Sequence, residues 1–139
     1  MITSTYVVSI IMALSPLFNI DPKLAVAVAT VESGLNANAV GSKGEIGLFQ
    51  VMPRVAKAKG FTAEQLKQPV INIYVGLQIL KDSKDKCVHS KDITWLVCYN
   101  YGPANAKKIK HPDKFPYVKK VKNKMGRFLA SDKESKHAW

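Results

Sequence analysis

The chain has 139 residues, of which 47% are hydrophobic and 22% are charged. This length fits one domain, residues 1–139, and excludes two ordinary ones, and the composition is that of a soluble globular protein. Lys and Arg number 21 against 10 Asp and Glu, a net charge of +11, so we expect a polyanionic partner: nucleic acid, anionic lipid or an anionic cell wall.

The first predicted helix covers about residues 5–18, in an apolar run from Tyr6 to Phe18. The first Lys is Lys23, so the run has no basic residue before it, and it shows no convincing small-residue cleavage site. It is also too short to span a bilayer. We therefore interpret the run as a core helix rather than a signal peptide.

A second helix is predicted from Asp21-Pro22, an N-cap followed by a first-turn proline, to Gly34. Glu32 is its only charged residue after Lys23, and Val28 and Ala29 lie one turn before it. Apolar surroundings and the helix C-terminus both disfavour the ionised form, so we expect a raised pKa and a general acid. The alternative is a buried glutamate paired with Lys or Arg.

From residue 36 to residue 50, glycines at every third position predict turns and a short hairpin. A short helix is then predicted from Met52-Pro53 to Gly60, followed by a capping box at Thr62 and Gln65. A longer helix after Pro69 is predicted to bury one apolar face, made of Val70, Ile71, Tyr74, Leu77 and Leu80.

Asp92 is predicted to cap a helix that continues through Trp95, expected in the core, to Tyr99 and breaks at Gly102-Pro103. The last predicted helix covers about residues 115–130, before a polar tail at 131–139. It is amphipathic: its apolar positions are Val118, Val121, Met125 and Phe128, and its basic positions are Lys119, Lys120, Lys122, Lys124 and Arg127. Residues 107–139 carry eleven Lys and Arg against three Asp and Glu, a net charge of +8.

Two cysteines and three scattered histidines form no metal-binding pattern, and we predict no metal site. Cys98 lies in an apolar run and is predicted to be a small buried side chain. A disulfide with Cys87 is left open.

Three segments in order resemble the soluble lytic transglycosylases, which are related to goose-type lysozyme. They are Glu32-Ser33-Gly34, the segment 47–53 with Gln50 eighteen residues after Glu32, and the segment 98–103. The resemblance covers about residues 10–121 and includes Asn72-Ile73 in the helix after Pro69 and the pair Tyr117-Val118. It implies an α+β, predominantly α-helical, lysozyme-like fold with a small β-hairpin or sheet beside a glycan-binding cleft.

The activity implied by the resemblance is cleavage of the β-1,4 bond between N-acetylmuramic acid and N-acetylglucosamine. Glu32 would protonate the leaving oxygen and then, as a base, accept the proton of the muramic acid 6-hydroxyl, which attacks C1 of its own sugar. The product is a 1,6-anhydromuramic end, and no cofactor is expected.

The resemblance also marks residues that contact substrate: Ser33, Ser42, Phe49, Gln50, Met52, Tyr99, Asn100 and Tyr117. Ser42 takes this role because Gly41 stands where relatives commonly have a serine. For Phe49 and Met52, ordinary core packing is the alternative. Glu45 stands where relatives often have a small residue. It is either a second carboxylate that activates water, as in a hydrolytic muramidase, or a solvated side chain.

We therefore expect a monomer whose partners are peptidoglycan strands and, through the basic helix, the anionic cell envelope. The alternative for that helix is that its lysines are simply solvated. A cationic module that binds nucleic acid or membranes is a distant alternative, since aromatic residues are not interleaved with the basic ones. The expected place of action is the periplasm or cell exterior, and the lack of a clear signal peptide suggests a phage-encoded endolysin or virion-associated enzyme.

Overall fold

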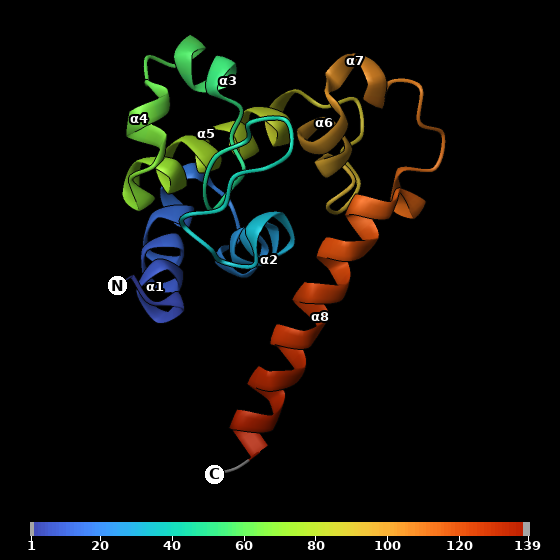
Figure 1. Ribbon diagram of the computed structural model, residues 1–139. Coiled ribbons are helices and arrows are strands. Elements are labelled where there is room, and N and C mark those ends of the chain that lie inside the picture. Colours follow the sequence, from blue (N-terminus) through green and yellow to red (C-terminus); the bar gives the residue numbers. More distant parts are fainter. Residues whose placement is uncertain (1, 138–139) are drawn as a thin grey trace. The chain divides into compact units, whose positions relative to one another are not determined.

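A computed structural model describes the backbone of residues 2–137 and the side chains of residues 2–126. The chain divides into two compact units, one up to Lys81 and one from Asp82 onward, and we describe each separately. Both are mostly helical (Figure 1). The predominantly α-helical fold class is confirmed, whereas a single domain over residues 1–139 stays a prediction.

The first unit begins with α1 (Ser4–Leu14) and the 3₁₀ helix η1 (Ser15–Phe18). The predicted helix over residues 5–18 therefore changes type near its end, where Pro16 lies in the first turn of η1. Val7 and Ile11, one turn apart, are buried, whereas Leu17 is 76% exposed. Only one stripe of this run belongs to the core.

Helix α2 (Pro22–Ser33) has the ends that its sequence predicts. The Asp21 carboxylate accepts a hydrogen bond from the backbone N–H of Lys23 at 2.9 Å. Gly34 ends the helix at a φ of 64°, in the left-handed conformation that glycine adopts without steric cost. The buried part of α2 is the continuous run Leu24 to Ala29, so the helix lies deep in the first unit.

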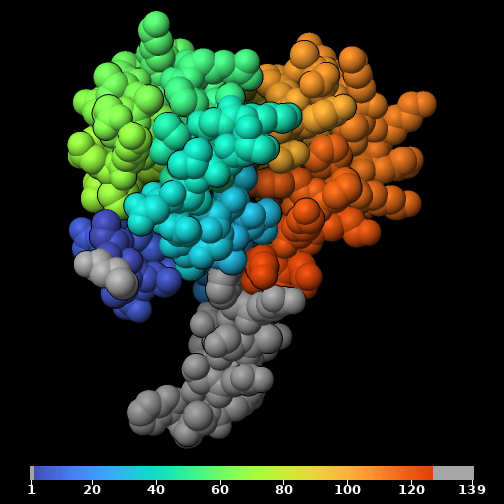
Figure 2. All heavy atoms as spheres, in the orientation of Figure 1, coloured from blue at the N-terminus to red at the C-terminus, as the bar shows by residue number. Residues whose placement is uncertain are grey.

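The segment after α2 folds into turns joined by two isolated antiparallel bridges, Val40 with Ile46 and Ile46 with Val51. Ile46 and Val51 exchange both backbone hydrogen bonds at 3.0 Å. Within the described residues the pairing extends no further, so the predicted hairpin or sheet is not confirmed. In Figure 2 the cyan and teal atoms of this segment lie on the face toward the viewer.

Three helices complete the first unit: α3 (Pro53–Ala58), α4 (Ala63–Leu66) and α5 (Pro69–Lys86), of which α5 continues into the second unit. The capping box of Thr62 and Gln65 is present, with both of its hydrogen bonds formed. The predicted buried face of α5 is partly wrong, because Val70 and Tyr74 are exposed. The residues that α5 buries are Asn72, Ile73, Val75, Gly76, Leu77 and Leu80.

The second unit contains α6 (Leu96–Tyr101), α7 (Pro103–Ala106), η2 (Pro112–Lys114) and α8 (Pro116–His137). Gly102 separates α6 from α7 as predicted. Asp92 does not cap the helix, since α6 begins four residues later and Asp92 itself lies in a turn with a φ of 54°. Trp95 is 3% exposed, which confirms its place in the core.

Helix α8 is amphipathic where its side chains are described. Val118 and Val121 are fully buried, whereas Lys119 and Lys120 are exposed. The helix extends to His137, past the predicted end near 130, while the side chains of Arg127 and Phe128 lie outside the described residues. In the described part of the chain, no helix is both long enough and apolar enough to cross a bilayer.

Candidate active site

Glu32 lies in the last turn of α2, one residue before the helix ends at Ser33. Its side chain is half-buried, as are Val31 and Ser33 on either side. The turn before it is fully buried, with Val28 and Ala29 at 0% exposure. The carboxyl therefore projects from the end of an apolar helix, as the sequence predicts.

Ser33 joins the end of α2 to the segment that follows. Its hydroxyl donates to the Leu48 carbonyl at 2.8 Å and also lies 3.1 Å from the Ala29 carbonyl. The same oxygen accepts from the Asn36 backbone N–H at 3.3 Å. The Ser33 hydroxyl is thus engaged within the protein, and it fixes residue 48 beside the turn that carries Glu32.

Asn72 holds the same segment from the side of α5. Its Nδ2 donates to the carbonyls of Ile46 at 2.8 Å and Leu66 at 3.0 Å, and its Oδ1 accepts from the Phe49 N–H at 2.9 Å. Asn72 is 1% exposed, and these bonds use both of its donors and its acceptor oxygen. A buried amide that is satisfied in this way specifies one position for the segment 46–49.

Two glycines make this packing possible. At Gly47, whose φ is 77°, an added Cβ would lie 2.4 Å from Asn72 Nδ2. At Gly76, an added Cβ would lie 2.5 Å from Cγ of Phe49, so the aromatic ring packs directly on the α5 backbone. Phe49 is 1% exposed. This burial favours the core-packing alternative for Phe49, and its contact with substrate stays a prediction.

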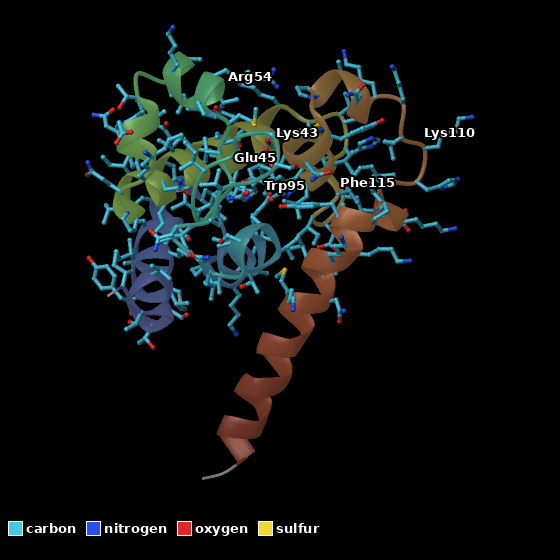
Figure 3. All side chains as sticks on the ribbon, in the orientation of Figure 1. Lys43, Glu45, Arg54, Trp95, Lys110 and Phe115 are labelled. Carbon is cyan, nitrogen blue, oxygen red and sulfur yellow. A yellow bond between two sulfur atoms is a disulfide. The ribbon has the colours of Figure 1, made fainter. Side chains whose placement is uncertain are left out.

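Gln50 and Glu45 surround Gly41. The Gln50 Nε2 donates to the carbonyls of Gly47 at 2.9 Å and Ala39 at 3.3 Å. Glu45 is half-buried, and its Oε1 is buried with no hydrogen-bond partner. One carboxylate oxygen of Glu45 is thus shielded from solvent, and both alternatives for this residue stay predictions. Figure 3 shows Glu45 on the loop between α2 and α3.

The other two predicted residues of the first unit are less enclosed. Ser42 is exposed in the turn between Gly41 and Gly44, and Met52 is half-buried at the N-cap of α3.

Three predicted residues belong to the second unit. The rings of Tyr99 and Tyr117 have centroids 6.3 Å apart and are tilted by 37°. Tyr99 is half-buried on α6, and Tyr117 is 7% exposed at the start of α8. Asn100, next to Tyr99, is exposed. The structure thus brings the two tyrosines together as a pair.

Cys87 and Cys98 form a disulfide across eleven residues of sequence. It joins the chain just after α5 to α6, one residue before Tyr99. Cys98 is 5% exposed, so its predicted burial is confirmed, and the bond that the sequence left open is present. Spacing alone could not have revealed it, because two cysteines eleven residues apart fit a bond or two free thiols equally well.

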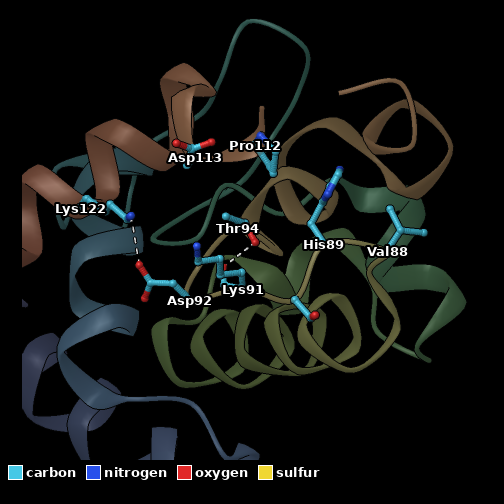
Figure 4. A pocket seen from close by; sticks show the side chains of 9 residues that line it. Val88, His89, Lys91, Asp92, Thr94, Pro112, Asp113 and Lys122 are labelled. Carbon is cyan, nitrogen blue, oxygen red and sulfur yellow. Dashed lines mark hydrogen bonds and ion pairs between the residues drawn. The ribbon is translucent and has the colours of Figure 1, made fainter. Parts of the chain in front are cut away.

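The second unit also contains an open polar hollow of about 550 Å³ (Figure 4). Lys122 of α8 reaches Asp92 at 3.0 Å on its wall, and Thr94 donates to the Lys91 carbonyl at 2.6 Å. Its lining contains no residue that the sequence analysis selected for the site.

Comparison with known proteins identifies the family. The family model described as a transglycosylase SLT domain matches residues 9–121. The chain belongs to this family. The match extends from the middle of α1 to the first turns of α8 and includes Glu32, Glu45, Gln50, Tyr99 and Tyr117.

Two relatives of this SLT domain carry names of the same kind. Over 94 residues it is 34% identical to a transglycosylase of Enterobacteria phage PRD1. The aligned region covers 68% of this chain and 34% of the relative. Over 125 residues it is 29% identical to a membrane-bound lytic murein transglycosylase C of Glaesserella parasuis serovar 5 (strain SH0165), covering 79% of this chain and again 34% of the relative. The chain therefore spans about a third of the length of these relatives.

Proposed function

We propose that this SLT domain is a peptidoglycan lytic transglycosylase in which Glu32 is the catalytic acid and base. The observation that carries the proposal is the placement of Glu32: half-buried at the apolar end of α2, in a chain that belongs to the SLT family. The names of the two relatives, a transglycosylase and a lytic murein transglycosylase, support the same activity.

In the proposed reaction, protonated Glu32 donates its proton to the glycosidic oxygen as the bond to C1 of muramic acid breaks. The resulting carboxylate then accepts the proton of the 6-hydroxyl while that oxygen bonds to C1 of the same sugar. The bond from C1 to the leaving oxygen is replaced by a bond from C1 to O6 of the same sugar, so the product is a 1,6-anhydro end. The proton lost to the leaving oxygen is replaced by the one from the 6-hydroxyl, so Glu32 ends protonated. Because the nucleophile belongs to the same sugar, most of the entropic barrier to recruiting one is absent.

The remaining site residues receive supporting roles. Ser33 is proposed as a positioning residue, because its hydroxyl already bonds to the Leu48 carbonyl and holds the Glu32 turn against the next segment. Gln50 is proposed to bind sugar, and Ser42 and Met52 to lie along the glycan. Tyr99, Asn100 and Tyr117 are proposed to contact the glycan, with Tyr99 orienting the reacting sugar.

A hydrolytic muramidase is the second candidate, and one observation favours it. Glu45 has a buried oxygen that accepts no hydrogen bond from the protein. A carboxylate that activates a water molecule needs such an uncommitted acceptor oxygen. In that reaction Glu45 would take a proton from water as the water oxygen bonds to C1, while Glu32 protonates the leaving group.

We also propose that the enzyme works on the anionic cell envelope outside the reducing cytoplasm. The net charge of +11 and the exposed Lys119 and Lys120 of α8 favour attraction to anionic wall polymers. The disulfide between Cys87 and Cys98 supports an oxidising place of action, since disulfides are rare in cytosolic proteins.

The proposal is tested by digestion of purified peptidoglycan with wild type and with Glu32→Gln, recording the product masses. The amide keeps the shape of the side chain but cannot deliver the proton. We expect Glu32→Gln to be slower by about 10²–10⁴-fold, the usual contribution of a general acid. Wild type should release 1,6-anhydro ends.

The matched control is Glu64→Gln, which changes an exposed glutamate of α4 that pairs with Lys67 at 2.8 Å. This variant should retain wild-type activity. Equal activity of Glu32→Gln and Glu64→Gln would refute the role of Glu32. Release of reducing muramic acid ends, which carry a hydroxyl from water at C1, would favour the muramidase.

A further inference from the structure

An open hollow of about 430 Å³ lies on the first unit, and its lining contains no residue that the sequence analysis selected for the site. Its walls come from the loop after α2, from Ile46 and from Lys67 at the C-cap of α4. This volume lies within the range of small-ligand sites, about 300–1,000 Å³. The hollow is therefore large enough to hold part of a substrate.

The lining combines apolar side chains with one cation. The apolar side chains are those of Ala37, Ala39, Val40 and Ile46. Of the described residues that line the hollow, Lys67 alone is charged, while Asn38 supplies an amide that can both donate and accept hydrogen bonds. Such a lining favours a peptide with aliphatic side chains and a carboxylate. It disfavours a sugar, whose hydroxyl groups would find few partners on apolar walls.

The ammonium group of Lys67 is available to a ligand. Lys67 pairs with Glu64 at 2.8 Å, and the two side chains are 61% and 82% exposed. A pair that is exposed to this extent contributes little to stability. Lys67 can therefore exchange this partner for the carboxylate of a ligand at low cost.

The walls of the hollow are fixed in the free protein. The buried Asn72 amide donates to the carbonyls of Ile46 and Leu66, so one side chain holds Ile46 and the residue next to Lys67. The Ala39 carbonyl accepts from the N–H of Gly47 at 2.8 Å. A ligand would thus meet a preformed site, which reduces the entropic cost of binding.

The hollow lies within reach of a peptide attached to the reacting sugar. Ala37 is five residues after Glu32, so their Cα atoms are at most about 18 Å apart. An extended peptide of four or five residues spans about 13–18 Å. The Ser33 hydroxyl also accepts from the N–H of Asn36, which holds the start of the loop at the turn that carries Glu32.

We propose that this hollow binds the peptide that peptidoglycan carries on its muramic acid, with an aliphatic side chain against Val40 and Ile46 and a carboxylate at Lys67. This inference rests on the proposed peptidoglycan-cleaving function. Stem peptides fit the chemistry of the hollow, because they are rich in alanine and carry free carboxylates.

The decisive test is a titration of the protein with free stem peptide, released from purified peptidoglycan and followed by methyl NMR. We expect the methyl signals of Val40 and Ile46 to shift, whereas those of Val70, an exposed valine of α5 outside the hollow, stay in place. Lys67→Ala should weaken the apparent affinity by about twofold to fivefold, the usual contribution of an exposed ion pair.

Kinetics tests the same hollow during cleavage. Val40→Asp adds a negative charge at an apolar wall, and it should lower kcat/KM by about tenfold on strands that carry peptides. On strands without peptides it should keep wild-type kcat/KM. The matched control Val70→Asp adds the same charge outside the hollow and should match wild type on both substrates. Val40 and Val70 are 72% and 47% exposed, so neither variant buries its charge and both should fold.

The inference is overturned if the methyl signals of Val40 and Ile46 do not move, or if Val40→Asp keeps wild-type kcat/KM on peptide-bearing strands. It is also overturned if Val40→Asp loses equally on both kinds of strand, which would make the hollow a glycan site. Failure of the proposed function looks different. Wild type would then leave all strands uncut, while the titration would still decide whether the hollow binds the peptide.

Discussion

At the scale of single residues, the loop beside Glu32 depends on Gly47 and Asn72 together. Asn72 bonds to Ile46, Phe49 and Leu66, and Gly47 leaves the space in which its amide lies. Removal of either should release the segment that Ser33 holds against the turn that carries Glu32.

Gly47→Ala tests this dependence, with Gly44→Ala as its matched control. Both glycines have a positive φ, 77° and 87°, so both variants carry the strain of about 1–2 kcal/mol that a side chain has there. Only the Gly47 variant also meets Asn72, since nothing lies within 4 Å of an added Cβ at Gly44. We expect Gly47→Ala to lower the free energy of unfolding by about 2 kcal/mol more than Gly44→Ala, because Asn72 must give up buried hydrogen bonds.

Urea denaturation of both variants measures this difference. If both variants lower the free energy of unfolding equally, the Asn72 amide can move away from the added methyl group without cost, and it does not fix the loop.

Glu32 could be selected from the sequence because an isolated charge in an apolar helix is a local pattern. The role of Asn72 could not, since its partners lie 6, 23 and 26 residues away along the chain. The burial of Phe49 depends in the same way on a distant glycine, Gly76. Contacts of this kind come from tertiary packing and leave no periodic signal.

At the scale of elements, the helix ends were predictable and the buried faces less so. Asp21, Gly34 and the Thr62–Gln65 capping box act on neighbouring backbone groups, and all three are confirmed. The face of α5 was partly wrong because Tyr74 packs at the surface, where its ring meets Phe18 and Phe61 at centroid distances of 5.4 and 6.0 Å. A short run with three glycines likewise indicated turns correctly, but it did not determine whether strands form.

The disulfide between Cys87 and Cys98 is expected to stabilise the connection from α5 to α6. A loop of this length should contribute about 3 kcal/mol through the restriction of the unfolded chain. Replacement of both cysteines by serine should lower the melting temperature, and reducing agent should have that effect on wild type only. If reduction leaves the wild-type melting temperature unchanged, the bond contributes no stability.

At the scale of the whole molecule, the net charge of +11 is the feature that the sequence alone establishes. An excess of positive charge of this size should speed the encounter with an anionic wall. Salt should weaken this effect, because the screening length falls from about 10 Å at 0.1 M to about 3 Å at 1 M.

We therefore expect the rate on intact peptidoglycan to fall several-fold between low and high salt. The double variant Lys119→Glu, Lys120→Glu should be slower than wild type at low salt and equal to it at high salt. Asp92 pairs with Lys122, so this design leaves that contact of α8 in place. A salt dependence that is the same for both proteins would exclude these lysines from the attraction.

The central claim is that Glu32 assists attack of the muramic acid 6-hydroxyl on C1 of the same sugar, and that water takes no part in the cleavage. The most direct measurement is a digest of peptidoglycan by wild type in water labelled with oxygen-18, with the masses of the new muramic acid ends recorded. Anhydro ends without label are the predicted result. Hydrated ends that carry the label would contradict the account and show that the enzyme is a hydrolase.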